Sequence, residues 1–113
     1  MDTTKLINCL NLFREYEEDI PIGTMICFLH LCENDGATVG QVENKFGFGK
    51  SRSSRNMRNL TDRARPGKPG INVAFYRPSP SDFRVTTFHL NEKGQELRDR
   101  LKKVLSGTTR VAG

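Results

Sequence analysis

The sequence has no run of apolar residues long enough to cross a bilayer, which takes about 20 residues in a helix. It also lacks a basic N-terminal region followed by an apolar stretch, the pattern of a secretory signal. We therefore expect a cytoplasmic protein without a membrane partner. No internal repeat and no long linker divides the 113 residues, so residues 1–113 are expected to form a single domain.

Residue patterns that carry catalysis are also lacking. The chain has two histidines, His30 and His89, and neither stands in a recognisable nucleophile or metal motif. Segment 47–50 (Gly-Phe-Gly-Lys) lacks the spacing of a phosphate-binding loop and is better explained as a turn. We therefore expect a protein that is not an enzyme and has no cofactor.

Cysteines are few, and their number is odd. Three of them stand in apolar contexts, which fits buried reduced thiols better than a disulfide framework. Cys27, His30 and Cys32 form a Cys-x-x-His-x-Cys pattern, but on one continuous helix they do not converge on one face and no fourth ligand is evident, so no metal site is expected. Cys9 is expected to be buried, with a redox-sensing thiol as the alternative.

Positive charge is concentrated in one part of the chain. The net charge is +5, but the segment from Lys45 to Arg84 contains ten cations against two anions, Asp62 and Asp82, and so carries +8. A basic stripe of this kind collects phosphate oxygens by releasing counterions, whereas evenly spread charge does not. The distribution favours a polyanion as the partner.

Apolar periodicity and capping residues predict a mostly α fold with a small β-hairpin (α+β). We expect the first helix to begin at the capping candidates 2–4 and reach about Glu18, and the second to run from 19 or 20 to a turn at 34–36. Thr38 and Gln41 form a capping box for a short third helix. The remaining expectations are a fourth helix from the cap Ser51 to about Arg65, a breaker-rich loop at 65–70, strands at 71–77 and 83–90, a last helix from the cap Asn91 to about 106, and frayed ends at 1–3 and 106–113.

The fourth helix has one narrow apolar face, made by Ser53, Met57, Leu60 and Ala64. Arg55 lies opposite, and side chains that can read base edges or clamp phosphates surround it. A solvated basic face would look the same, but the hairpin that follows supplies a basic wing. The aromatic side chains of that hairpin are expected to pack on the helices at alternating strand positions: Phe75, Tyr76, Phe83 and Phe88.

Two segments are distinctive: 77–84 (Arg-Pro-Ser-Pro-Ser-Asp-Phe-Arg) and 90–94 (Leu-Asn-Glu-Lys-Gly). They resemble the wing, and the start of the helix that follows it, in the MarR family of winged-helix transcription regulators. The resemblance covers roughly residues 20–105. It implies a winged helix-turn-helix with the helix-turn-helix at 38–65 and the wing at 71–90, in which Arg84 enters the minor groove and Asp82 orients that arginine. The positions that match in identity and spacing are Asp82, Arg84, Leu90, Glu92, Lys93 and Gly94, while Asn91 stands where the family usually has threonine.

The resemblance also implies a homodimer built from the first and last helices, 1–18 and 91–106. The first helix supports this expectation, because two of its rows are apolar and one small core cannot cover both. The expected dimerisation residues are Leu6, Leu10, Phe13, Leu101 and Leu105.

We therefore interpret the chain as a sequence-specific regulator of transcription that binds duplex DNA. One alternative is a winged-helix module that binds a protein and modulates host or partner transcription machinery, using the acidic end of the first helix. Another is a regulator switched by a thiol or by a small-molecule effector, whose identity the sequence leaves open. The expected DNA-binding residues are Ser51, Arg52, Ser54, Arg55, Arg58, Asn59, Arg77, Asp82 and Arg84.

Overall fold

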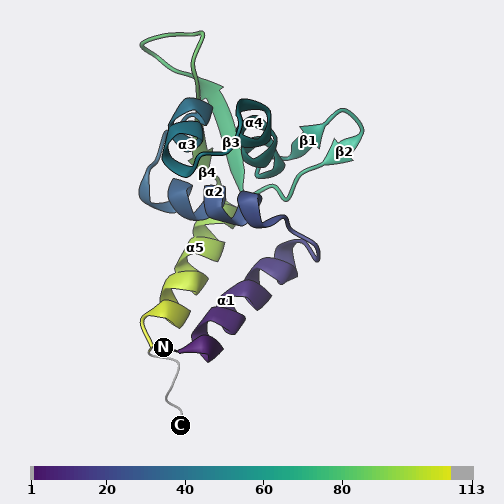
Figure 1. Ribbon diagram of the computed structural model, residues 1–113, viewed down its shortest axis with the longest axis vertical. Coiled ribbons are helices and arrows are strands. Elements are labelled where there is room, and N and C mark those ends of the chain that lie inside the picture. The colour runs from purple at the N-terminus through teal and green to yellow at the C-terminus, as the bar shows by residue number, and fades with distance from the viewer. Residues whose placement is uncertain (1, 108–113) are drawn as a thin grey trace.

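The computed structural model describes residues 2–107, which form five helices and two small antiparallel hairpins (Figure 1). None of the described helices is long and apolar enough to span a bilayer. We call β3 (Ala74–Pro78), β4 (Thr86–Leu90) and the loop between them the wing (residues 74–90). The elements are, in chain order, α1 (Thr3–Tyr16), α2 (Ile22–Glu33), α3 (Val39–Phe46), α4 (Lys50–Asn59), β1 (Arg63–Arg65), β2 (Lys68–Pro69), β3 (Ala74–Pro78), β4 (Thr86–Leu90) and α5 (Glu92–Leu105).

Three helices begin at the side-chain caps that the sequence predicts. The Asp2 carboxylate accepts a hydrogen bond from the backbone of Lys5 at the start of α1. Thr38 and Gln41 form a complete capping box on α3, and Asn91 caps α5. These confirmed caps fix where α1, α3 and α5 begin.

The first turn of α1 is more ordered than expected. Thr3 is already helical, so the expectation of fraying was wrong there, because the Asp2 cap satisfies a backbone donor of the first turn. Residues 1 and 108–113, for which fraying was also expected, lie outside the described residues.

The core lies where α2 meets α3, α4 and the wing. Phe28 and Leu31 of α2, Val42 of α3 and Leu60 at the end of α4 are fully buried or nearly so. Gly47 ends α3 in the left-handed conformation, and α4 follows after a short turn. This pair of helices packed on α2, followed by the wing, is the winged helix-turn-helix arrangement.

The wing is attached to the helices through backbone pairing. Within it, β3 and β4 pair antiparallel, with Tyr76 opposite Phe88. Phe88 also exchanges backbone hydrogen bonds with the segment between α2 and α3: its N–H donates to the Ala37 carbonyl (2.9 Å) and its carbonyl accepts from the Gly36 N–H (2.9 Å). The base of the wing therefore cannot shift without disturbing the helix-turn-helix.

Helices α1 and α5 lie side by side and extend away from the rest of the molecule (Figure 1). The Arg100 guanidinium of α5 donates to the Glu15 carboxylate of α1 (2.8 Å). Phe13 and Leu101, which we expected at a dimer interface, are instead core residues: they are only 2% and 4% exposed within the single chain. Packing between α1, α2 and α5 already covers them.

The end of α4 differs most from expectation. The helix was expected to reach Arg65 but ends at Asn59, and residues 63–69 turn back as a second hairpin, β1–β2. Its two-residue turn is Pro66-Gly67, where Gly67 has φ +78°, a conformation that L side chains rarely adopt. Proline and glycine therefore close this hairpin, while the carbonyls of residues 59–62, at and just past the end of the helix, accept hydrogen bonds from the backbone of residues 70–74.

Further boundaries also need correction. Ser51 lies inside α4, whose N-cap is Gly49 without a side-chain hydrogen bond. Ala64 is buried as expected, but it lies on β1 and not on α4. The wing strands are shorter than predicted, since residues 71–73 run along the end of α4 and 79–85 form the wing loop.

Candidate nucleic-acid interface

The rotation of α4 is fixed by a buried polar network. The Thr24 hydroxyl of α2 donates to the Asn56 side-chain oxygen (3.1 Å) and accepts from the Asn59 side-chain nitrogen (3.0 Å). Thr24 is fully buried and Asn56 nearly so, and Met57 anchors the same side of the helix. Because buried polar groups are costly to leave unpaired, this network sets which face of α4 points outward.

The outward face of α4 is basic. Arg52, Arg55 and Arg58 are exposed, with Ser51 exposed and Ser54 half-buried beside them. Among the described residues, no ion pair engages any of these three arginines. The helix therefore presents its arginines to solvent, as the sequence predicted, and the described residues supply no acidic partner for them.

Asn59 departs from its expected role. It was expected to read a base beside the arginines, yet its amide is held by Thr24 and the residue is half-buried. Its place at the C-terminal end of α4, over the start of α2, explains the contact. Asn59 positions the helix.

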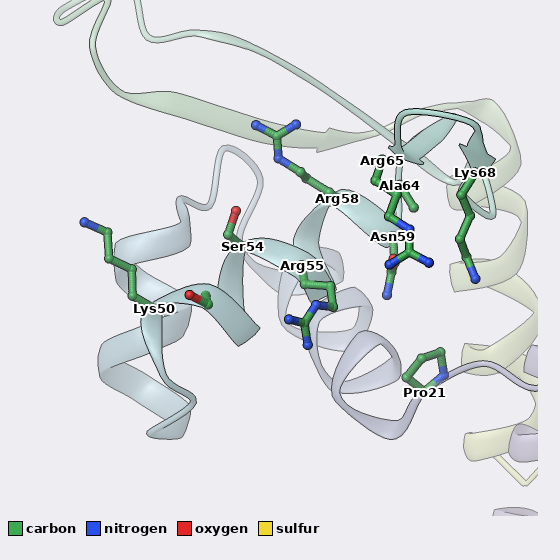
Figure 2. A pocket seen from close by; sticks show the side chains of 10 residues that line it. Pro21, Lys50, Ser54, Arg55, Arg58, Asn59, Ala64, Arg65 and Lys68 are labelled. Atoms are coloured by element: carbon green, nitrogen blue, oxygen red, sulfur yellow. The ribbon is translucent and has the colours of Figure 1, made fainter.

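Helix α4 and the β1–β2 hairpin form the two walls of an open groove with a volume of about 620 Å³ (Figure 2). Arg55 and Lys68 extend into it from opposite walls, with Pro21 at its edge, whereas Arg58 points away from Lys68 (Figure 2). The Arg58 guanidinium lies 6.0 Å from the centre of the Tyr76 ring on β3. Five of the residues that line the groove are cations and none is acidic. The full lining consists of Pro21, Lys50, Ser51, Ser54, Arg55, Arg58, Asn59, Ala64, Arg65 and Lys68.

The wing tip carries an arginine held by an aspartate. The Asp82 carboxylate accepts from the Arg84 backbone N–H (3.0 Å), from its Nε (3.1 Å) and from its terminal nitrogen (3.3 Å). These hydrogen bonds from Arg84 hold the pKa of Asp82 below its usual range. The Arg84 side chain is still 90% exposed, and Arg77 on β3 is exposed too. The pairing that the resemblance implied is present.

The aromatic side chains of the wing differ from expectation. Phe88 is buried as predicted, but Phe75 and Tyr76 are exposed on the other strand, and Phe83 in the loop is 80% exposed. Phe83 lies in residues 79–85, which leave the sheet, so the alternation of a strand does not apply to it.

The cysteines are free, and two of the three are buried. Burial raises the pKa of Cys27 to about 11 and that of Cys32 to about 11, and it also raises the pKa of Cys9. Thiols with raised pKa values are poor nucleophiles at neutral pH. In the described part of the chain, no three His, Cys, Asp or Glu residues come together as a metal site.

Sequence reasoning missed the β1–β2 hairpin, although its signal is present. Pro66-Gly67 lies between Arg65 and Lys68, which pair across the turn. A two-residue turn containing glycine between short extended segments is a hairpin signal. The neighbouring helical pattern obscured it, because Leu60 and Ala64 also fit a helical period.

In sequence comparisons, no family model and no curated protein matches this chain. Among solved structures, it is similar to a MarR transcriptional regulator from Methanosarcina mazei Go1, with a TM-score of 0.68 and 22% sequence identity. The match covers 88% of this chain and 65% of that regulator, so this chain spans just under two thirds of its length. The fold is a winged helix of the MarR type.

Proposed function

We propose that this protein binds duplex DNA in a sequence-specific manner and regulates transcription, with α4 as the recognition helix. The observation that carries the proposal is the two-sided character of α4. One side is locked to α2 through Thr24 and Asn56, and the other presents Arg52, Arg55 and Arg58 without acidic partners among the described residues. A rigid helix with an arginine face is suited to the major groove, where arginine pairs with guanine O6 and N7.

The N-terminal end of α4 supplies contacts to the DNA backbone. Gly49 leaves the first amides of the helix without a side-chain cap. Ser51 and Ser54 lie beside them, and helix N-termini favour phosphate. These contacts fix the position of the helix on the duplex while the arginines read bases.

The wing is proposed to contact the neighbouring minor groove. Arg84 is held by Asp82 at the tip, and Arg77 lies exposed on β3. Arginine is attracted to narrow minor grooves by their negative potential. Restraint by Asp82 lowers the entropy lost when Arg84 enters the groove.

We further propose that the protein acts as a homodimer through α1 and α5. Leu6 and Ile7 are each 56% exposed, Leu10 is 42% exposed, and Leu105 of α5 is 59% exposed. Such apolar side chains on a pair of terminal helices favour a two-fold interface. A two-fold dimer would bind half-sites about 34–36 Å apart, or a multiple of that spacing.

The proposal is tested by a salt titration of the full chain on a random duplex pool and on duplexes selected from it. A DNA regulator binds both at low salt, with affinity falling as salt rises, and keeps a preference for the selected duplexes. A winged helix that binds only a partner protein shows no duplex binding. A protein that binds DNA without sequence preference gives equal affinities for both pools.

A further inference from the structure

The β1–β2 hairpin is fastened firmly to the end of α4. The Thr61 hydroxyl donates to the Arg58 carbonyl (2.7 Å) in the last turn of the helix. The Gly70 N–H donates to the Asp62 carbonyl (3.1 Å), and the Ile71 N–H donates to the Asn59 carbonyl (2.9 Å). The hairpin is therefore positioned by the same helix that carries the arginine face.

Close packing at the hairpin base leaves little freedom. A Cβ added to Gly70 would collide with the Thr61 carbonyl oxygen, so this crossing point requires glycine. Ala64, on β1 of the hairpin, is buried. The base is thus fixed mainly by backbone contacts, and the exposed side chains of the hairpin contribute little to holding it.

Those exposed side chains are basic. Arg63, Arg65 and Lys68 are all exposed, and within residues 2–107 no ion pair engages their side chains. Asp62 is the one acid in the sequence between Leu60 and Val73. Like charges so close together repel in the free protein, and a polyanion would relieve that repulsion.

The groove lies between the basic side chains of the hairpin and those of α4. Arg65 and Lys68 line it from the hairpin, and Lys50, Arg55 and Arg58 line it from α4 (Figure 2). The wing tip and the hairpin project from the region of α4 in different directions (Figure 1). One hairpin therefore lies near each side of the helix.

We propose that the β1–β2 hairpin is a second DNA-contacting element, and that Arg65 and Lys68 clamp the phosphates of one strand in the groove beside α4. The inference rests on the proposed function and adds a site to it. The surface fits a backbone strand because cations from the hairpin and from α4 line the same groove and no acidic residue lies among the lining residues. Lysine and arginine are the side chains that hold phosphate oxygens.

The experiment measures affinity against salt concentration for the full chain on a random-sequence duplex of about three helical turns. The double variant Arg65→Ala/Lys68→Ala is compared with Lys5→Ala/Lys102→Ala, which removes the same charge from the terminal helices. A third variant, Arg65→Lys/Lys68→Arg, keeps the charge in the hairpin. Circular dichroism melting shows whether each variant is folded.

Each lost phosphate contact should lower the slope of log affinity against log salt by about 0.9, so the hairpin variant should lose about 1.8. The ratio of parent to variant affinity should then shrink roughly tenfold between about 50 and 200 mM salt. The control pair should keep a slope close to the parent's, and the charge-keeping variant should recover it.

Three results would overturn the inference. In the first, the parent binds DNA and the hairpin variant has the parent's slope, which leaves the proposed function standing. In the second, the terminal-helix pair loses as much slope as the hairpin variant, so that the effect is net charge alone. In the third, the parent binds no duplex at low salt, which also overturns the proposed function.

Discussion

Asp82 and Arg84 form a closed pair at the wing tip, in which one carboxylate accepts from both the backbone and the guanidinium of the same arginine. Their side chains are 39% and 90% exposed, so solvent screens the pair and it adds little to stability. Its effect is on direction, because the arginine is held in one orientation at the tip of a loop. The pair is therefore expected to matter for binding more than for folding.

Removing either partner should weaken DNA binding. Arg84→Ala should lower the slope of log affinity against log salt by about 0.9, since one phosphate-neutralising charge is lost. Asp82→Ala should also weaken binding, although it removes an anion, because Arg84 loses its restraint. Asp62→Ala is the matched control: it removes an exposed acid beside β1, and should leave affinity unchanged or raise it. Tighter binding by Asp82→Ala would show that the pair does not position the arginine.

The Asp82–Arg84 ion pair should also remain formed at mildly acidic pH. Hydrogen bonds from Arg84 lower the pKa of Asp82, so the carboxylate stays ionised until the pH falls below its usual value of about 3.9. The contribution of Asp82 to binding, measured as the affinity ratio of parent to Asp82→Ala, should therefore be constant between about pH 5 and 8. A ratio that collapses within that window would assign the effect to another group.

Thr24 should be the most sensitive polar position beneath α4. Thr24→Val keeps the shape but leaves Asn56 and Asn59 without a shared partner, and should lower the free energy of unfolding by roughly 1–3 kcal/mol in urea. Thr24→Ser keeps the hydroxyl and should lose only about 0.8 kcal/mol for the methyl group. Ser53, whose buried hydroxyl has no hydrogen-bond partner among the described residues, should tolerate alanine without loss. If both Thr24 variants lowered the free energy of unfolding equally, the hydrogen bonds of the Thr24 hydroxyl would not be what stabilises this position.

The helices could be predicted from the sequence because apolar periodicity and capping residues are local signals. The capping box at Thr38 and the caps at Asp2 and Asn91 are decided within one helical turn, and all three occur as expected. The end of α4 could not be predicted in this way. It depends on backbone hydrogen bonds from residues 70–74 to residues 59–62, which no periodicity within the helix reveals.

The cysteines should react slowly in the folded protein. Burial raises the pKa of Cys27 and Cys32 to about 11, so near pH 8 roughly one thiol in a thousand is ionised. Thiol labelling at pH 8 should therefore be slow until urea unfolds the chain, after which all three cysteines should react. Because the raised pKa values favour the protonated folded state, the free energy of unfolding should fall as pH rises from about 8.5 toward 11. Rapid labelling of one cysteine in the native protein would favour a thiol-switched regulator.

Self-association should depend on the exposed apolar face of α1. Leu10→Asp should dissociate the proposed dimer at micromolar concentration, as measured by light scattering, because it places a carboxylate in the apolar interface. Leu29→Asp is the control, since Leu29 is 45% exposed but lies on α2. A parent protein that is monomeric at this concentration, or a Leu10→Asp variant of unchanged size, would contradict the dimer.

The candidate site was predictable in its charge and less so in its geometry. The arginines of α4 and the Asp82–Arg84 pair could be expected from helical spacing and from the resemblance of the wing. The role of Asn59 could not, because its partner Thr24 is 35 residues away in the sequence. Likewise, Phe13 and Leu101 looked like interface residues only because the packing of α1 on α2 and α5 was not known.

The measurement that tests the central claim most directly is the affinity of Arg55→Ala for selected and random duplexes at one salt concentration. If α4 reads bases in the major groove, the variant should lose roughly 1–3 kcal/mol on the selected duplex and much less on random DNA. Arg14→Ala, which removes an exposed arginine from α1, should lose little on either. Equal losses of Arg55→Ala on both duplexes, or a parent protein without preference for the selected sequence, would contradict the account.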